Sequence, residues 1–296
     1  MWRLPVSLEN IHPTDFYSFA LAIMMFSMGL TLKTKDFIHV LAAPKAACLG
    51  LGGQLLLLPI VAFLLVNILP LPPEAAIGLI ILSACPGGVT SNGIVYAVRA
   101  DVALSITLTA TASLITVFTL PLIVSFGLVY IFGASTELHL PLVKTMQSLF
   151  TITAMPVALG MLVNRYWPRF RDKIETPCRW ITIVLLIAII THGTVSNINT
   201  LASRLGLIIV ASTVLVCLTM GVGYGLSRLC SLDKKQGITI SVEIGVQNVA
   251  MSFLIAGTYL KRQDFTTLPA VYGVCMFTVT AIFLWFMRKR AIVGAV

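Results

Sequence analysis

Apolar stretches of about twenty residues follow one another along almost the whole chain, separated by short segments with charged residues or prolines. In hydrocarbon every backbone N–H and C=O group must find a partner inside the protein, so such stretches fold as membrane-spanning helices. The composition agrees, because 58% of the residues are hydrophobic and 10% are charged. We therefore predict an all-α, polytopic membrane protein in which residues 1–296 form a single transmembrane domain surrounded by lipid.

Nine spans are predicted from these stretches. They cover about residues 15–32, 44–69, 73–98, 102–131, 140–164, 178–199, 203–228, 236–260 and 266–287.

The distribution of lysine and arginine predicts the orientation. If the N-terminus lies outside, the segments that face inside hold fifteen of the 20 lysines and arginines. The outer segments hold the other five, which are Arg3, Lys144, Arg204, Lys261 and Arg262. Short cytoplasmic loops carry an excess of positive charge, so we expect the N-terminus outside and the C-terminus in the cytoplasm, in a bacterial inner membrane. This asymmetry also explains the net charge of +9, and no basic cluster predicts a nucleic-acid partner.

Glu243 is the one acidic residue that the predicted spans place inside the membrane. An ionised carboxylate there costs at least about 3 kcal/mol, so Glu243 should face protein or water and meet a cation. Gly245 is followed by Gln247 and Asn248, which favours an interruption of the helix around 244–247 that frees backbone carbonyls. Carboxylate, amide and carbonyl oxygens suit Na⁺ or another hard cation. Alternatively, the two amides hold packed helices together.

A second interruption is predicted in the third span, where Cys85-Pro86-Gly87-Gly88 separates residues 75–84 from 89–98. Pro86 removes a backbone donor, and the two glycines relax the chain. Each interrupted span is followed by one closing span. The two interrupted spans cross the membrane in opposite directions. Matching interruptions in two halves indicate an inverted-repeat transporter with a central site. The repeats would cover about residues 15–131 and 140–287, with the leading helix of the first repeat lost before Phe16.

Neighbouring spans contribute further oxygens. Ser105 and Thr109 are four residues apart and share one helix face. Such hydroxyls often bond to a carbonyl of the preceding turn instead of to a ligand. Gln54 follows Gly-Leu-Gly-Gly, small residues that let another helix come close, and as a lone amide it could join helices or bind an ion.

Four motifs in this order resemble the bile acid:sodium symporter (BASS) family over nearly the whole chain. They are F-S-M-G-L-T-L in the first span, C-P-G-G-V-T-S-N and R-A-D-V-A-L-S-I-T-L-T in the third and fourth, and S-V-E-I-G-V-Q-N in the eighth. The resemblance is to the nine-span members. It implies two broken helices that cross each other in a core domain, which moves against a smaller panel domain.

The resemblance also implies two Na⁺ sites and no organic cofactor. The first site would be formed by Ser91, Asn92, Ser105, Thr109 and Glu243. The second would be formed by Gln54, Glu243, Gln247 and the carbonyls of Ile244 and Val246. The substrate would lie against Val89, Thr90, Asn248, Phe277 and Thr278. Val89, Phe277 and Thr278 depart from the bacterial bile-salt binders, so the expected substrate is an organic anion, either bile-acid-like or a small carboxylate such as pantoate.

The expected function is therefore sodium-coupled import of an organic anion by alternating access, and not enzymatic catalysis. An alternative is a proton-coupled or arsenite-type efflux carrier on a related fold, which Cys85 beside Pro86 suggests. An intramembrane enzyme is a further alternative. The chain has no H-E-x-x-H motif, and His192, the one histidine in clearly apolar sequence, is expected to be a hydrogen-bonded structural residue.

Overall fold

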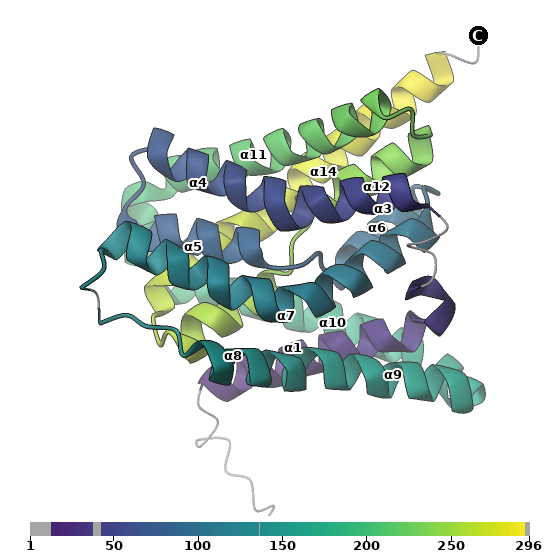
Figure 1. Cartoon of the computed structure of the whole chain (residues 1–296), viewed down its shortest axis with the longest axis horizontal. Coiled ribbons are helices and arrows are strands. Elements are labelled where there is room, and N and C mark those ends of the chain that lie inside the picture. The colour runs from purple at the N-terminus through teal and green to yellow at the C-terminus, as the bar shows by residue number, and fades with distance from the viewer. Residues whose placement is uncertain (1–12, 38–42, 136, 294–296) are drawn as a thin grey trace, which may run out of the picture.

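The computed structural model describes residues 13–37, 43–135 and 137–293. Over these ranges the chain is helical, and its one β-type pairing is an isolated bridge between Gly87 and Gln247. This agrees with the predicted all-α class. The helices run nearly parallel or antiparallel to one long direction of the molecule (Figure 1).

The elements of the first part of the chain are α1 (Pro13–Thr31), α3 (Pro44–Gly52), the π-helical turn η2 (Gly53–Leu57), α4 (Leu58–Ile68), α5 (Pro73–Ala84), α6 (Val89–Ala97) and α7 (Val102–Phe132). The later elements are α8 (Leu142–Leu149), the π-helical turn η3 (Phe150–Ala154), α9 (Met155–Tyr166), α10 (Pro168–Ser196), α11 (Ile198–Leu229), α12 (Lys234–Gly245), α13 (Val249–Phe253), the π-helical turn η4 (Leu254–Tyr259), the 3₁₀ turn η5 (Gln263–Thr266) and α14 (Thr267–Val293).

Within the described residues, 6 helical stretches are long and apolar enough to cross a membrane. They are Pro44–Ile68, Val102–Phe132, Leu142–Tyr166, Pro168–Ser196, Arg204–Leu229 and Gln263–Met287. Shorter apolar helices cover Phe16–Thr31, Pro73–Ala84 and Val249–Tyr259, which belong to the first, third and eighth predicted spans. The third and eighth spans are interrupted as predicted, between α5 and α6 and between α12 and α13. The total of nine spans stays a prediction.

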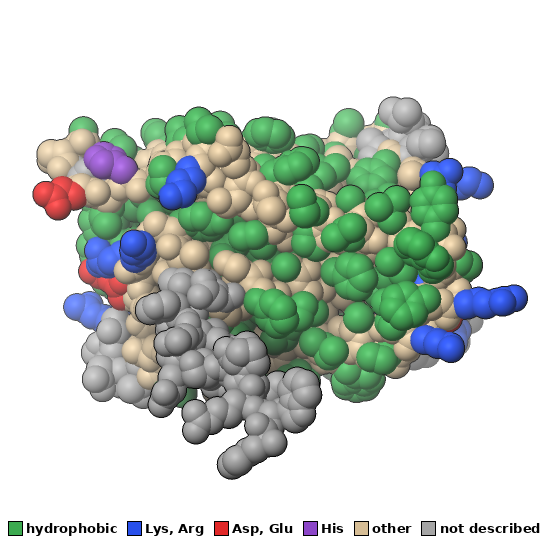
Figure 2. Space-filling model, turned by 90° about the horizontal axis from the view of Figure 1, so that it is seen from below, with side chains coloured by type: hydrophobic (Ala, Val, Ile, Leu, Met, Phe, Trp, Pro, Cys, Tyr) green, Lys and Arg blue, Asp and Glu red, His purple; other side chains and the backbone are tan. Residues whose placement is uncertain are grey.

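One face of the molecule shows the charge pattern of a membrane protein. Hydrophobic side chains cover the middle of this face, and lysines, arginines and acidic residues gather towards its two ends (Figure 2). An apolar band between two charged rims matches the layers of a bilayer.

Helix α10 begins earlier than predicted. The sixth span was expected to start at residue 178, but α10 starts at Pro168 and includes the charged segment that was interpreted as a loop. Pro168 is well suited to a first helical position, where no N–H is needed. Glu175 then pairs with Arg171 and Arg179, four residues away on each side, which stabilises the exposed first turns.

Helices α1, α9 and α10 pack on one another, and Figure 1 shows α1, α8 and α9 along one side of the molecule. Glycines permit the close approach of α1 and α9. A Cβ on Gly29 would lie 2.3 Å from the carbonyl oxygen of Val157, and one on Gly160 would lie 2.5 Å from that of Phe26. Small residues of this kind are how membrane helices reach close contact.

A buried tyrosine joins this helix group to the segment before α14. The hydroxyl of Tyr17 in α1 lies 2.9 Å from Nδ1 of His192 in α10 and 3.3 Å from Oε1 of Gln263 in η5. His192 is therefore hydrogen-bonded, as the sequence predicted.

Candidate ion and substrate site where two helices break

The two helix breaks lie against each other. The backbone N–H of Asn248 donates to the carbonyl of Pro86 at 2.9 Å, and that of Gly88 donates to the carbonyl of Val246 at 3.3 Å. These bonds flank the antiparallel bridge between Gly87 and Gln247. Non-helical backbone inside a membrane is stable only where protein satisfies it, and here each break satisfies the other.

Local sequence explains where both helices stop. Pro86 biases Cys85 towards an extended conformation, and Cys85 has φ −73° and ψ 153°. In the second break, the Gln247 side chain donates from Nε2 to the carbonyl of Ile244 at 2.6 Å and so caps the end of α12. The side chain of Asn248 accepts from the N–H of Met251 at 3.1 Å and caps the start of α13.

Glu243, near the end of α12, has an exposed fraction of 0%. Its Oε1 accepts a hydrogen bond from the hydroxyl of Ser105, and its Oε2 accepts one from the hydroxyl of Thr109 at 2.7 Å. Both donors lie on the face of α7 that the sequence predicted. Asn92 joins them, because its Oδ1 lies 2.7 Å from Ser105 Oγ and 3.3 Å from Thr109 Oγ1.

This cluster has more acceptors than hydrogens. Each hydroxyl carries one hydrogen, yet each lies within bonding distance of both Asn92 and Glu243. Among the described residues, no lysine, arginine or histidine forms an ion pair with Glu243. A buried carboxylate is stable when a positive charge compensates it, so the surplus oxygen lone pairs suit a cation.

Ser91 belongs to the same cluster, since its side chain also interacts with that of Glu243. It is buried, and its hydroxyl donates to the carbonyl of Gly88 at 2.7 Å. The oxygen keeps a lone pair for a further partner. Thus Ser91, Asn92, Ser105, Thr109 and Glu243 are all brought together.

The residues predicted for the second site also meet. Gln54 lies in the π-helical turn η2, and its Nε2 donates to the backbone carbonyl of Glu243 at 3.2 Å. Within the part of the chain that the structure describes, the side-chain oxygens of Gln54 and Gln247 are both buried and have no hydrogen-bond partner. Buried acceptors are usually satisfied, and these two side chains hydrogen-bond to the carbonyls of neighbouring residues, so their remaining oxygens suit a cation.

One expectation for this site was wrong. The interruption around 244–247 was expected to free backbone carbonyls, but those of Ile244, Gly245 and Val246 each accept one hydrogen bond. The donors are Gln247 for Ile244, the hydroxyl of Tyr272 for Gly245 at 2.9 Å, and Gly88 for Val246. The sequence could not show this because two of the donors come from distant parts of the chain. Each carbonyl oxygen retains a second lone pair for a cation.

Gly87 connects the two clusters. A Cβ built on Gly87 would lie 2.9 Å from Gln54 Nε2 and 2.9 Å from Glu243 Oε2. From the sequence, this glycine was predicted to relax the chain where the helix breaks. Its lack of a side chain also lets the α5–α6 break approach both polar groups.

The residues expected to contact the substrate are spread over the breaks and α14. Val89 and Thr90 are half-buried at the start of α6, and the Nδ2 group of Asn248 is a buried donor with no partner among the described residues. Phe277 is half-buried against the apolar interior. Thr278 is exposed, and its hydroxyl bonds to the carbonyl of Val274 in the preceding turn.

Two supporting contacts were missed by sequence reasoning. Tyr272 in α14 is fully buried, and its hydroxyl holds the carbonyl of Gly245 at the end of α12. Thr239 in α12 accepts from the N–H of Asp101, just before α7, at 3.0 Å. A polar residue within an apolar run was the available signal, but its partner could not be identified from sequence.

Cys85 does not form part of a soft-metal cluster in the described chain. It is buried, and its thiol donates to the carbonyl of Ile81 at 3.3 Å. No group of three or more His, Cys, Asp or Glu residues gathers among residues 13–37, 43–135 and 137–293.

Comparison with known proteins identifies the family. Residues 18–204 match the model of the Sodium Bile acid symporter family. A probable chloroplastic sodium/metabolite cotransporter of Oryza sativa subsp. japonica is 30% identical over 94% of this chain and 65% of its own length. An uncharacterized sodium-dependent transporter of Bacillus subtilis (strain 168) is 29% identical over 87% of this chain and 77% of its own.

The human ileal sodium/bile acid cotransporter is 28% identical over 90% of this chain and 76% of its own length. The chain spans 65% to 66% of the length of the three chloroplastic relatives that it matches.

Proposed function

The chain belongs to the Sodium Bile acid symporter family, and from this we propose that it is a secondary symporter that couples the import of an organic anion to Na⁺. Two Na⁺ ions would bind where the two helices break. The first would be held by Ser91, Asn92, Ser105, Thr109 and Glu243, and the second by Gln54, Glu243, Gln247 and the carbonyls of Ile244 and Val246.

One observation carries this proposal. Glu243 is fully buried without a cationic partner among the described residues, and it is surrounded by oxygens that outnumber the available hydrogens. Na⁺ favours hard oxygen ligands, and the surrounding donor set consists of carboxylate, amide, hydroxyl and carbonyl oxygens. A proton on Glu243 would neutralise the charge, but it would leave the amide oxygens of Gln54 and Gln247 unsatisfied.

Charge balance links the ions to the substrate. Two Na⁺ ions and one carboxylate leave a charge of +1, which an organic anion would neutralise, so ions and anion would favour each other's binding. A tenfold sodium gradient supplies about 1.4 kcal/mol per ion. A membrane potential of about 100 mV adds about 2.3 kcal/mol for the net charge moved. The sum of about 5 kcal/mol would support accumulation of several thousand-fold.

The anion would bind at the same breaks, against Val89, Thr90, Asn248, Phe277 and Thr278. The unpartnered Nδ2 donor of Asn248 supports this placement, because a carboxylate or sulfate oxygen accepts from such a group. The start of α6 adds backbone N–H groups that favour negative charge. A bile-acid-like anion or a small carboxylate such as pantoate would fit this chemistry.

For transport, we propose nine spans in two inverted repeats of about residues 15–131 and 140–287. The group formed by α1, α8, α9 and α10 would act as the panel, and the core that carries both breaks would move against it. The N-terminus would lie outside, the C-terminus inside, and the protein in a bacterial inner membrane. Rocking of one helix group against another around a central site is the usual form of alternating access.

Uptake into proteoliposomes tests the proposal. Labelled taurocholate and labelled pantoate would be offered with an inward gradient of either NaCl or choline chloride at equal pH on both sides, and in a third sample with a pH gradient and no Na⁺. We expect accumulation of at least one of the two anions with Na⁺, increased by an inside-negative potential, and none with choline. Equal uptake in choline, or uptake driven by a pH gradient alone, would contradict sodium coupling.

A further inference from the structure

A groove with basic and apolar walls lies at the end of α1 and α9, separate from the helix breaks. Its cations are Lys33, Lys35 and Arg165, and its apolar side chains include Ala158, Met161 and Leu162. We call these six residues the basic groove. Its cavity volume is ≈ 620 Å³, which lies within the range of small-molecule sites.

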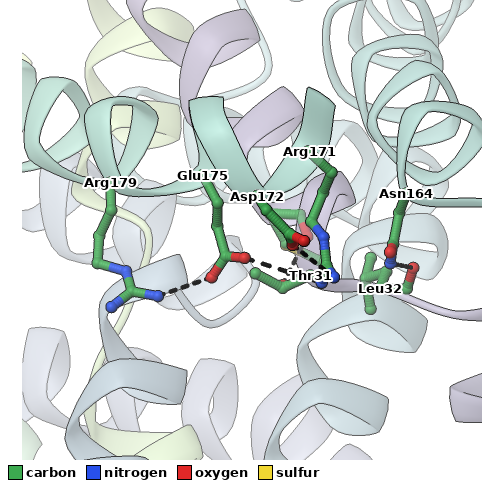
Figure 3. Close-up of polar contacts among 8 residues, drawn as sticks. Thr31, Leu32, Asn164, Arg171, Asp172, Glu175 and Arg179 are labelled. Carbon is green, nitrogen blue, oxygen red and sulfur yellow. Dashed lines mark hydrogen bonds and ion pairs between the residues drawn. The ribbon is translucent and has the colours of Figure 1, made fainter. Parts of the chain in front are cut away.

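The carboxylates near this groove already have partners. Asp172 pairs with Arg171 at 2.7 Å, and Glu175 pairs with Arg179 at 2.8 Å. Figure 3 shows this row of charges beside the end of α1. Asp36 accepts from the backbone N–H of Lys33 at 2.7 Å.

The three cations of the basic groove outnumber Asp36, the acidic residue of the same segment. Over the described part of the chain, none of Lys33, Lys35 and Arg165 forms an ion pair. Three cations against one carboxylate, Asp36, leave a net positive charge around the cavity, which favours an anion.

The groove also continues into the apolar surface of α9. Met155, Leu159 and Leu162 are exposed and recur at helical spacing, so they form one apolar stripe that reaches the groove at Leu162. Tyr166 and Trp167 follow directly and are also exposed. Aromatic residues at the end of an apolar stripe are typical of the interface between membrane and water.

A hydrogen bond fixes the two walls of the groove to each other. The Nδ2 group of Asn164 in α9 donates to the carbonyl of Leu32, just before Lys33, at 2.7 Å (Figure 3). The cations of the segment after α1 are thereby held on the same side as Arg165.

We propose that the basic groove binds an anionic membrane phospholipid. Lys33, Lys35 and Arg165 contact the phosphate of the headgroup, and an acyl chain lies along Ala158, Met161 and Leu162 towards the exposed stripe of α9. A basic pocket at the membrane surface is suited to acidic lipid headgroups. The predicted orientation places this end of the molecule at the cytoplasmic leaflet, where such headgroups concentrate.

Thermal unfolding of the purified full chain in neutral detergent tests this site. The additions are dioleoylphosphatidylglycerol, dioleoylphosphatidylcholine, sn-glycerol 3-phosphate as the free headgroup, and taurocholate as a soluble amphipathic anion. The test variant is Lys33→Gln/Lys35→Gln/Arg165→Gln. The matched control is Arg169→Gln/Lys173→Gln/Lys235→Gln, which removes three exposed cations of the same predicted side outside the groove.

We expect phosphatidylglycerol to raise the unfolding midpoint of the wild-type protein at concentrations where phosphatidylcholine and the free headgroup have no effect. The test variant should require about 100-fold more phosphatidylglycerol, because each cation near an anionic headgroup contributes about 1 kcal/mol. The control variant should respond as the wild type does. If the triple variant does not fold, Arg165→Gln alone should show a shift of about fivefold.

Three results would overturn the proposal. Equal stabilisation by the two lipids would mean that the charge is not recognised, and a wild-type response of the test variant would place the lipid elsewhere. Stabilisation by the free headgroup or by taurocholate that the test variant loses would assign the groove to a soluble anion.

Discussion

Gly87 and Gln247 lie opposite each other in an antiparallel bridge, one in the break between α5 and α6 and the other in the break between α12 and α13. This contact brings the two breaks together beside Glu243. The contact leaves no room for a side chain at position 87, because a Cβ on Gly87 would lie 2.9 Å from Gln54 Nε2 and 2.9 Å from Glu243 Oε2. The proposed ion sites therefore depend on a glycine as well as on their ligands.

Gly87→Ala should weaken Na⁺ binding by at least about tenfold and leave the fold intact. The new methyl group meets the ends of two side chains, which can shift at the expense of the site. Gly93→Ala is the matched control, since a Cβ there meets nothing within 4 Å. In a helix interior that change adds about 1 kcal/mol of stability. The Na⁺ dependence of the unfolding midpoint measures both variants, and equal Na⁺ responses would contradict the placement of the ions at Gly87.

Glu243→Gln should weaken Na⁺ binding by at least about 100-fold, because removing one charge of a buried pair costs about 3 kcal/mol or more. Ser105 and Thr109 can still donate to the amide oxygen, so the variant should remain folded. Without Na⁺ it should be at least as stable as the wild type, since the buried charge is gone. Thermal unfolding in choline chloride and in NaCl measures both effects. A large loss of stability in choline would indicate a structural role for the carboxylate.

Gln247→Ala should remove one of the two proposed ions and retain the other. Its Oε1 is assigned to the second site, whereas the first site lies between α6, α7 and Glu243. The Na⁺ dependence of anion uptake should change from sigmoidal to hyperbolic, with a lower maximal rate. Gln147→Ala, at an exposed glutamine of α8, is the matched control and should keep the wild-type curve. A sigmoidal curve in Gln247→Ala would place the second ion elsewhere.

Tyr272→Phe should lower the free energy of unfolding by about 1 to 2 kcal/mol, because it leaves the buried carbonyl of Gly245 without its donor. Na⁺ affinity should fall only severalfold, since the side-chain oxygens of the site remain. Tyr96→Phe, at an exposed tyrosine of α6, should have no effect on either quantity. Chemical denaturation measures the free energy of unfolding, and Na⁺ titration measures the affinity. An unchanged free energy of unfolding would argue against a stabilising role of the Tyr272–Gly245 hydrogen bond.

Sequence alone predicted the main features of the site because they depend on local chemistry. Pro86 and the glycines around it stop a helix wherever they occur, and Ser105 and Thr109 share a face in any α-helix. The pairing of the two breaks, the contact of Tyr272 with Gly245 and the π-helical turn that carries Gln54 depend on tertiary packing. The early start of α10 was missed because its charged first turns resemble a loop until the pairing of Glu175 with two arginines is considered.

Equilibrium binding of radioactive ²²Na⁺ to the purified protein in detergent tests the central claim most directly, since it requires no knowledge of the substrate. The wild-type protein should bind Na⁺ saturably, with more than one ion per chain. Glu243→Gln should weaken this binding by at least about 100-fold, and the matched control Glu74→Gln, outside the helix breaks, should preserve it. Saturable Na⁺ binding of unchanged affinity in folded Glu243→Gln would contradict the account.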